Sequence, residues 1–162
     1  MTGFLDKFRK KVILNVWKDK PDESKVKEID DKIALGVLLW VVAETDEKFL
    51  PQEEEKIKEI LISHSKISDS DIPTVLASIK AASDERIDLY PFTRQISQNL
   101  PHEIKLSIIE NLFRVACVDK DLDAKEMGMI RKISGLFRIE HSDFIDAKIK
   151  IKKEFGLDVS EA

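Results

Sequence analysis

Two similar stretches decide the fold of this chain. Residues 42–53 read VAETDEKFLPQE, and residues 115–126 read VACVDKDLDAKE. They share the pattern Ala-x-x-Asp-x-x-Φ-x-x-x-Glu, where Φ is an apolar residue, and they lie 73 residues apart. Matching chemistry at one fixed spacing indicates a structural unit that occurs twice.

The similarity extends on both sides of this pattern. A shift of 73 residues aligns apolar side chains with each other, and after one residue of slippage the segment 67–72 aligns with 139–144. The aligned pairs include Ile33 with Leu106, Leu39 with Leu112, Trp40 with Phe113, Ile57 with Ile130 and Ile60 with Ile133. We therefore expect two repeats, at about residues 33–80 and 106–152, that share one core around a pseudo-twofold axis. On this interpretation the paired carboxylates form corners at the surface.

Apolar residues recur at helical spacing along the chain, and no segment alternates as a strand would. We predict an all-α fold of about eight helices. They cover residues 3–18, 22–45, 51 to at least 61, 71 to at least 79, 86–99, 102–118, 124–137 and 143–155. The segment Ile33–Ala43 is apolar on every side, which predicts the buried centre of the fold. Its 11 residues are well short of the roughly 20 that cross a bilayer.

The charge of the 162-residue chain is uneven. The formal net charge is −4, but residues 1–20 carry +4 and the remaining residues −8. An acidic body argues against nucleic acid as a partner. The predicted basic amphipathic helix at residues 3–18 either packs on the domain that follows, residues 22–157, or docks on an anionic membrane surface or an acidic protein. We expect a cytoplasmic protein, at the inner membrane surface if this helix docks there.

The repeated motif resembles the signature of TerB-like proteins, the tellurite-resistance protein B family. The segment Phe137–Lys148 is similar to a bacterial branch of that family, and the resemblance covers roughly residues 25–150. It implies an all-helical fold, a role in stress-response complexes and metal binding by the acidic turns. The family usually has glycine after the motif aspartate, where this chain has Glu47 and Lys120. Both turns therefore carry backbone strain or take another shape.

The candidate metal ligands are Asp119, Asp121 and Glu126, with Asp46 and Glu53 as a weaker copy. Carboxylates alone suit Ca²⁺, Mg²⁺ or Mn²⁺. An EF-hand loop is excluded, because Ala124 and Ile130 stand where glycine and the last carboxylate would be. The structural alternative is that the acids are helix caps. In that case Asp123 and Glu126 form a capping box, and the motif aspartates accept hydrogen bonds from turn N–H groups.

Three functional hypotheses follow. The first is a non-enzymatic interaction module with protein partners and a bound divalent cation. The second is a metal-dependent hydrolase that uses the clustered carboxylates, and the third is a purely structural adaptor. We predict no catalytic residue and no organic cofactor, because the three histidines lack an i, i+4 partner and no phosphate-binding loop occurs. The single cysteine, Cys117, fits a small buried core residue.

Overall fold

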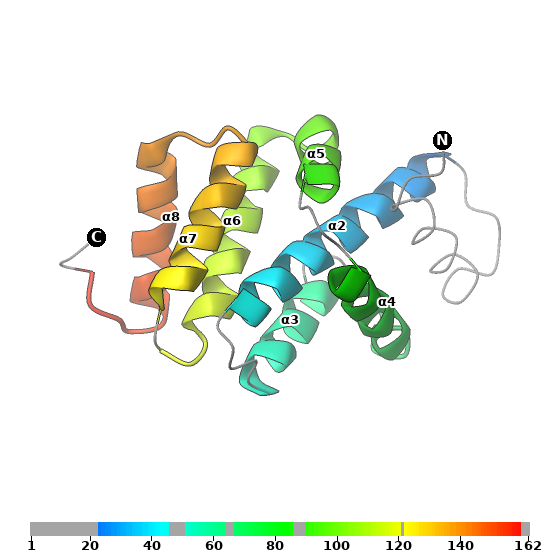
Figure 1. Cartoon of the computed structure of the whole chain (residues 1–162), viewed down its shortest axis with the longest axis horizontal. Coiled ribbons are helices and arrows are strands. Elements are labelled where there is room, and N and C mark those ends of the chain that lie inside the picture. The colour runs from blue at the N-terminus through cyan, green and yellow to red at the C-terminus, as the bar shows by residue number, and fades with distance from the viewer. Residues whose placement is uncertain (1–22, 46–50, 64–66, 86–89, 121, 160–162) are drawn as a thin grey trace.

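The structure is a computed structural model that describes residues 23–45, 51–63, 67–85, 90–120 and 122–159. Within these ranges the chain forms seven α-helices and no strand, so the prediction of an all-α fold is confirmed (Figure 1). The helices are α2 (Glu23–Thr45), α3 (Pro51–Ser63), α4 (Ile72–Glu85), α5 (Tyr90–Asn99), α6 (His102–Cys117), α7 (Ala124–Leu136) and α8 (His141–Glu154). The helix predicted at residues 3–18 lies outside the described residues.

Helix α2 is the centre of the fold. Every residue from 34 to 43 is buried, as the apolar run predicted. The helix packs against α3, α4, α5, α6 and α7, and Figure 1 shows it running obliquely through the molecule between α4 and α5. An all-apolar helix needs neighbours on every side, and this arrangement supplies them.

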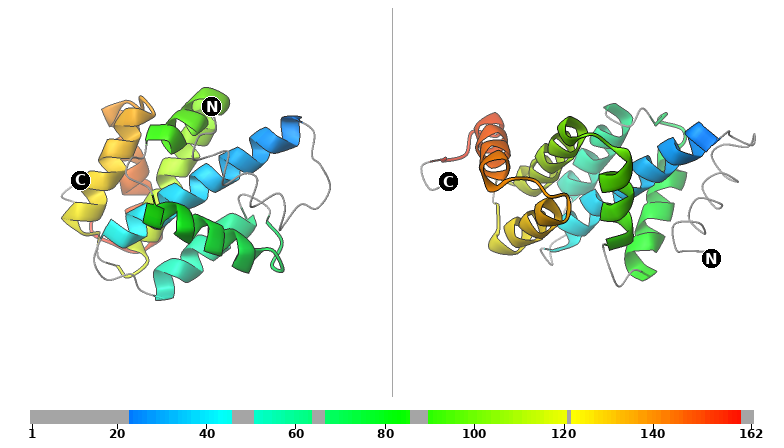
Figure 2. Two further views of the ribbon diagram at one scale, coloured as in Figure 1. Left: turned by 45° about the vertical axis from the view of Figure 1, so that its right-hand side comes forward. Right: turned by 90° about the horizontal axis from the view of Figure 1, so that it is seen from above.

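The two repeats are related in their packing as well as in their sequence. Helices α3 and α7 each have 13 residues and begin 73 positions apart. Each packs on the first helix of its own repeat and on that of the other, since α3 contacts α2 and α6, and α7 contacts α6 and α2. In Figure 2, the view from above places the third helices of the repeats, α4 and α8, on opposite flanks of the α2–α6 pair. This exchange of contacts is the arrangement that a pseudo-twofold axis produces.

One glycine sets how closely α4 approaches α2. A Cβ atom on Gly36 would lie 2.3 Å from Cδ1 and 3.0 Å from Cγ1 of Ile79. Ile79 is fully buried, so it has little room to move aside. The absence of a side chain at Gly36 therefore allows α4 to pack directly on the central helix.

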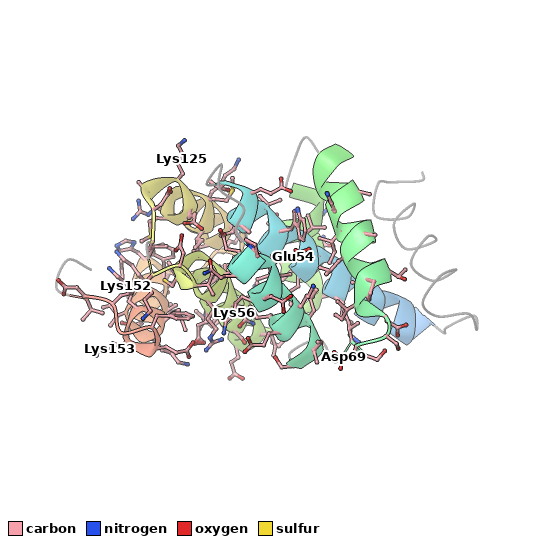
Figure 3. The ribbon with its side chains drawn as sticks, turned by 90° about the horizontal axis from the view of Figure 1, so that it is seen from below. Glu54, Lys56, Asp69, Lys125, Lys152 and Lys153 are labelled. Atoms are coloured by element: carbon pink, nitrogen blue, oxygen red, sulfur yellow. The ribbon has the colours of Figure 1, made fainter. Side chains whose placement is uncertain are left out.

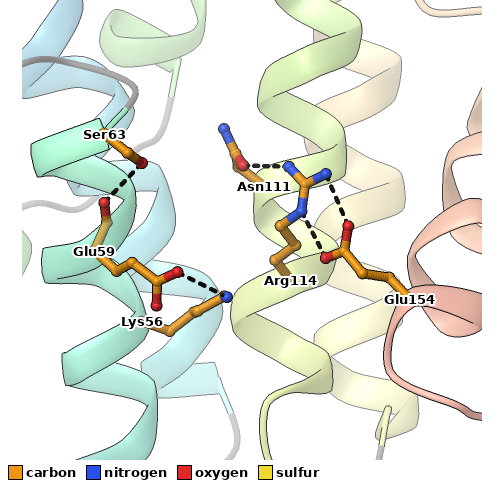
Figure 4. Close-up of polar contacts among 6 residues, drawn as sticks. All are labelled: Lys56, Glu59, Ser63, Asn111, Arg114 and Glu154. Atoms are coloured by element: carbon orange, nitrogen blue, oxygen red, sulfur yellow. Dashed lines mark hydrogen bonds and ion pairs between the residues drawn. The ribbon is translucent and has the colours of Figure 1, made fainter.

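The contact between α6 and α8 combines apolar packing with ion pairs, of which the Arg114 pair is the most highly connected. Arg114 on α6 donates from Nε and Nη2 to the Glu154 carboxylate over 2.9 and 3.2 Å, and from Nη1 to Oδ1 of Asn111 over 2.7 Å (Figure 4). The Arg114 side chain holds the pKa of Glu154 below its ordinary value. This two-pronged geometry fixes the C-terminal end of α8 against α6.

Candidate functional site

The acidic turn between α6 and α7 contains a well-formed helix cap. Asp123 has extended backbone angles, and its Oδ1 accepts hydrogen bonds from the backbone N–H groups of Lys125 (2.6 Å) and Glu126 (3.1 Å). The predicted capping role of Asp123 is therefore confirmed. A cap explains Asp123 completely, but it does not explain where the Glu126 side chain lies.

The motif glutamates of both repeats are buried. Glu126 is 1% exposed and Glu53 is 2% exposed, and each occupies the third position of its helix, α7 or α3. The expectation that these glutamates form corners at the surface is wrong. Because α3 packs on α6 and α7 packs on α2, the side of each first turn that carries the glutamate faces the shared interior, although the residues before it are exposed.

Burial and neighbouring charge act together on Glu126. Burial and, to a smaller extent, the negative charges of Glu53 and Asp119 together raise its pKa from 4.5 to about 8, although hydrogen bonding with the Asp123 backbone opposes them. Its Oε1 atom is fully enclosed and has no hydrogen-bond partner among the described residues. A carboxylate in this setting favours either a proton or a cation over the bare charged form.

Asp119 and Cys117 adjoin the same cluster from the end of α6. Asp119 is half-buried in the turn that follows the helix. Burial and, to a smaller extent, the charges of Glu126 and Asp119 together raise the pKa of the Cys117 thiol to about 12. Cys117 is the fully buried small residue that the sequence predicted.

The predicted ligands are thus grouped differently from the way the motif suggested. We expected one site per turn, whereas Glu53 of the first repeat and Glu126 and Asp119 of the second act on one another electrostatically. Asp46 and Asp121 lie outside the described residues. Among the residues that are described, no three His, Cys, Asp or Glu side chains are arranged to hold a metal ion by themselves. The pairing across the repeats could have been foreseen only from the packing of α3 on α6.

The turn after Asp119 keeps a left-handed backbone without glycine. Lys120 has φ 64°, an angle that glycine adopts freely and other residues adopt at a cost. Of the two expected outcomes, strain or another shape, Lys120 shows the first. The equivalent residue of the first repeat, Glu47, lies outside the described residues.

The architecture defines a class of protein, namely an all-α domain of two packed repeats with a pair of buried glutamates between them. Residues 32–149 match the family model described as tellurite resistance protein TerB. Because this match covers most of the chain, the protein belongs to the TerB family. No curated protein and no solved structure matches it. None of the described helices is both long and apolar enough to cross a membrane.

Proposed function

We propose that this TerB-family protein is a non-enzymatic interaction module that binds a divalent cation between Glu53 and Glu126. The observation that supports the proposal is the burial of two carboxylates from equivalent positions of the two repeats, since this burial and the charge of Glu53 raise the pKa of Glu126 to about 8. Two like charges in a water-poor interior repel each other strongly. A divalent cation would neutralise both of them and would bind the enclosed Oε1 of Glu126.

The ligand types favour Mg²⁺ or Mn²⁺ over Ca²⁺ at this position. Mg²⁺ commonly binds through one or two carboxylates and keeps several of its waters, whereas Ca²⁺ takes six to eight oxygen ligands. Asp119 is the third carboxylate in the cluster and lies in the turn, closer to solvent than the two glutamates. We infer that Glu53 and Glu126 hold the ion and that Asp119 attracts it.

In this proposal the bound cation joins the two repeats. It would connect the first turn of α3 to the first turn of α7 and so fix the angle between the two repeats. The exposed surface that the two repeats present to a protein partner would then depend on whether the metal is bound. This is how an interaction module in a stress-response complex, in the cytoplasm or at the inner membrane surface, would respond to metal supply.

The test is a thermal melt of the full chain with Mg²⁺, Mn²⁺, Ca²⁺ or Zn²⁺ at pH 8. A ligand that binds only the folded protein raises the melting temperature. We expect Mn²⁺ and Mg²⁺ to raise it, and both Glu53→Gln and Glu126→Gln to abolish the increase. Glu103→Gln is the matched control, because Glu103 is an exposed first-turn glutamate of α6. An increase that survives both substitutions places the metal elsewhere, and no increase with any metal contradicts the proposal.

A further inference from the structure

Three cations gather where α8 faces α7. Lys148 on α8 is only 9% exposed, and the cations that act on it are Lys152, one turn further along α8, and Arg131 of α7. The Arg131 guanidinium lies 5.6 Å from the centre of the Phe144 ring, and Phe144 precedes Lys148 by one helical turn. We call Arg131, Lys148 and Lys152 the cationic seam.

The acids of α8 do not compensate this seam, because they face α6. Asp143 lies 3.5 Å from Nε2 of His102, Glu154 pairs with Arg114, and Asp146 lines a depression with Glu110 and Lys150. Among the described residues, no acid forms a hydrogen bond or an ion pair with Lys148. The Lys148 Nζ atom is not fully enclosed, so it reaches solvent. Burial and the charges of Lys152 and Arg131 all lower the pKa of Lys148.

The first repeat shows that the fold does not need a lysine at this position. The repeat alignment places Leu76 at Lys148, Lys58 at Arg131 and Lys80 at Lys152. These residues of the first repeat line a cavity of 340 Å³ between α3 and α4, and Leu76 is 7% exposed. A partly desolvated ammonium group that two other cations repel lowers stability unless an anion accompanies it. Leucine at the equivalent place avoids that penalty, so packing alone does not account for Lys148.

We propose that the cationic seam binds the phosphate group of a ligand. A phosphate dianion matches a cluster of three cations, since a guanidinium donates two parallel hydrogen bonds to phosphate oxygens and lysine contributes a compact charge. The Phe144 ring under the Arg131 guanidinium and the 9% exposure of Lys148 shield one side of the seam from water, which strengthens the attraction. The seam contains none of the proposed metal ligands, so this proposal does not depend on the metal proposal.

The phosphate could belong to a small solute or to a lipid headgroup, and two probes distinguish these sources. Pyrophosphate is titrated into the ¹⁵N-labelled full chain, and NMR shifts of the α7 and α8 amides are followed. In a second arm, co-sedimentation is measured with phosphatidylcholine vesicles that contain or lack phosphatidylglycerol. Saturable pyrophosphate binding identifies a soluble ligand, whereas binding only to the anionic vesicles identifies a headgroup.

Two leucine substitutions test whether the seam is the site. Lys148→Leu installs the residue of the first repeat, so we expect the variant to fold, to melt at a higher temperature and to bind about tenfold more weakly or worse. The control is Lys153→Leu, which makes the same change of charge at an exposed position of α8. Figure 3 shows Lys152 on the side of α8 that faces α7 and Lys153 on the opposite side.

The outcomes are decisive in either direction. Binding of either probe that Lys148→Leu removes and Lys153→Leu retains supports the seam. Equal weakening by both substitutions would mean that general positive charge attracts the probe, and it overturns the proposal. No saturable binding of either probe overturns it as well.

Discussion

Each repeat has an outer groove between its second and third helices, α3 and α4 in the first repeat and α7 and α8 in the second. These outer grooves differ far more than the inner faces of the repeats do. Inside, Glu53 and Glu126 occupy the same position of matching helices, and Leu39 and Leu112 are equivalent core residues. Outside, the first repeat leaves cavities of 340 and 640 Å³ between α3 and α4, both lined by Lys58, Ile72 and Pro73. Figure 3 views this side of the molecule, with Glu54 and Asp69 labelled at the two cavities. In the second repeat the rings of Phe113 and Phe144 lie 5.4 Å apart, and cations line the seam.

This difference shows which constraints act on the repeats. Residues at the shared interior must fit both copies at once, so a change in one repeat disturbs the other. Residues on the outer grooves contact only their own repeat and are free to diverge. The buried glutamates belong to the first group and the cationic seam to the second.

The largest effect that we expect is a difference in stability loss when equivalent residues of the two grooves, Phe144 and Ile72, are each replaced by alanine. Phe144→Ala should lower the free energy of unfolding by about 3–5 kcal/mol, because its ring is 2% exposed and packs on Phe113. Ile72→Ala should cost about 2 kcal/mol, at the low end for such a change, since Ile72 already borders a cavity. Urea unfolding followed by circular dichroism measures both. Equal losses would show that the grooves are packed alike.

The next effect tests whether the glutamate pair couples the repeats. The native state keeps the Glu126 proton up to a pKa of about 8, whereas the unfolded chain releases it near 4.5. The native state therefore binds more protons between these values, and the free energy of unfolding must fall as the pH rises from about 4.5 to about 8. Glu126→Gln should remove this fall and raise the free energy of unfolding at pH 8 by about 2–4 kcal/mol.

Two controls make the pH measurement specific. Glu103→Gln should retain the pH dependence of the wild-type protein, because Glu103 is exposed. Glu53→Gln should reduce the dependence only in part, since it removes one neighbouring charge and leaves the burial of Glu126 unchanged. A wild-type protein whose stability does not change across this range would contradict the electrostatic description of the pair.

A smaller effect concerns two glycines, one in each repeat. Gly36→Ala should lower the free energy of unfolding by about 1–3 kcal/mol, because the new methyl group would collide with the buried Ile79 side chain. Gly128→Ala in α7 should raise it by about 0.5–1 kcal/mol, because nothing lies within 4 Å of the new Cβ. Thermal melts of the two variants give the comparison. A stabilised Gly36→Ala variant would mean that α4 does not pack tightly on α2.

The smallest effect tests the turn that lacks the family glycine. Lys120→Gly should raise the free energy of unfolding by about 1 kcal/mol, since it relieves the left-handed strain at φ 64°. Lys125→Gly should have the opposite sign, because residue 125 is in the first turn of α7. Denaturant melts of the two single variants measure these changes. A lower free energy of unfolding for Lys120→Gly would show that the stabilisation from the lysine side chain exceeds the cost of its left-handed backbone.

Local signals were sufficient to predict the helices. Helices α3 and α7 begin at Pro51 and Ala124, as predicted, because the proline and the Asp123 cap act within a single turn. The buried run of α2 was also predictable, because a helix that is apolar on all sides can be stable only inside the protein.

The site was less predictable, because it depends on contacts between the repeats. Glutamate is rarely buried, so the sequence alone suggested a surface position for Glu53 and Glu126. Their burial results from the crossing of α3 with α6 and of α7 with α2, which no local pattern encodes. The alignment of Lys148 with Leu76 was the one sequence signal that could have revealed the cationic seam.

The position of Cys117 has a chemical consequence. A thiol with a pKa of about 12 is almost entirely in its neutral form at any cellular pH, and the neutral form is neither a nucleophile nor a metal ligand. Oxidants and alkylating reagents should therefore leave Cys117 unmodified in the native protein, and two copies should not become cross-linked through sulfur. Since the chain has no other cysteine, thiol–disulfide exchange should not affect its folded state.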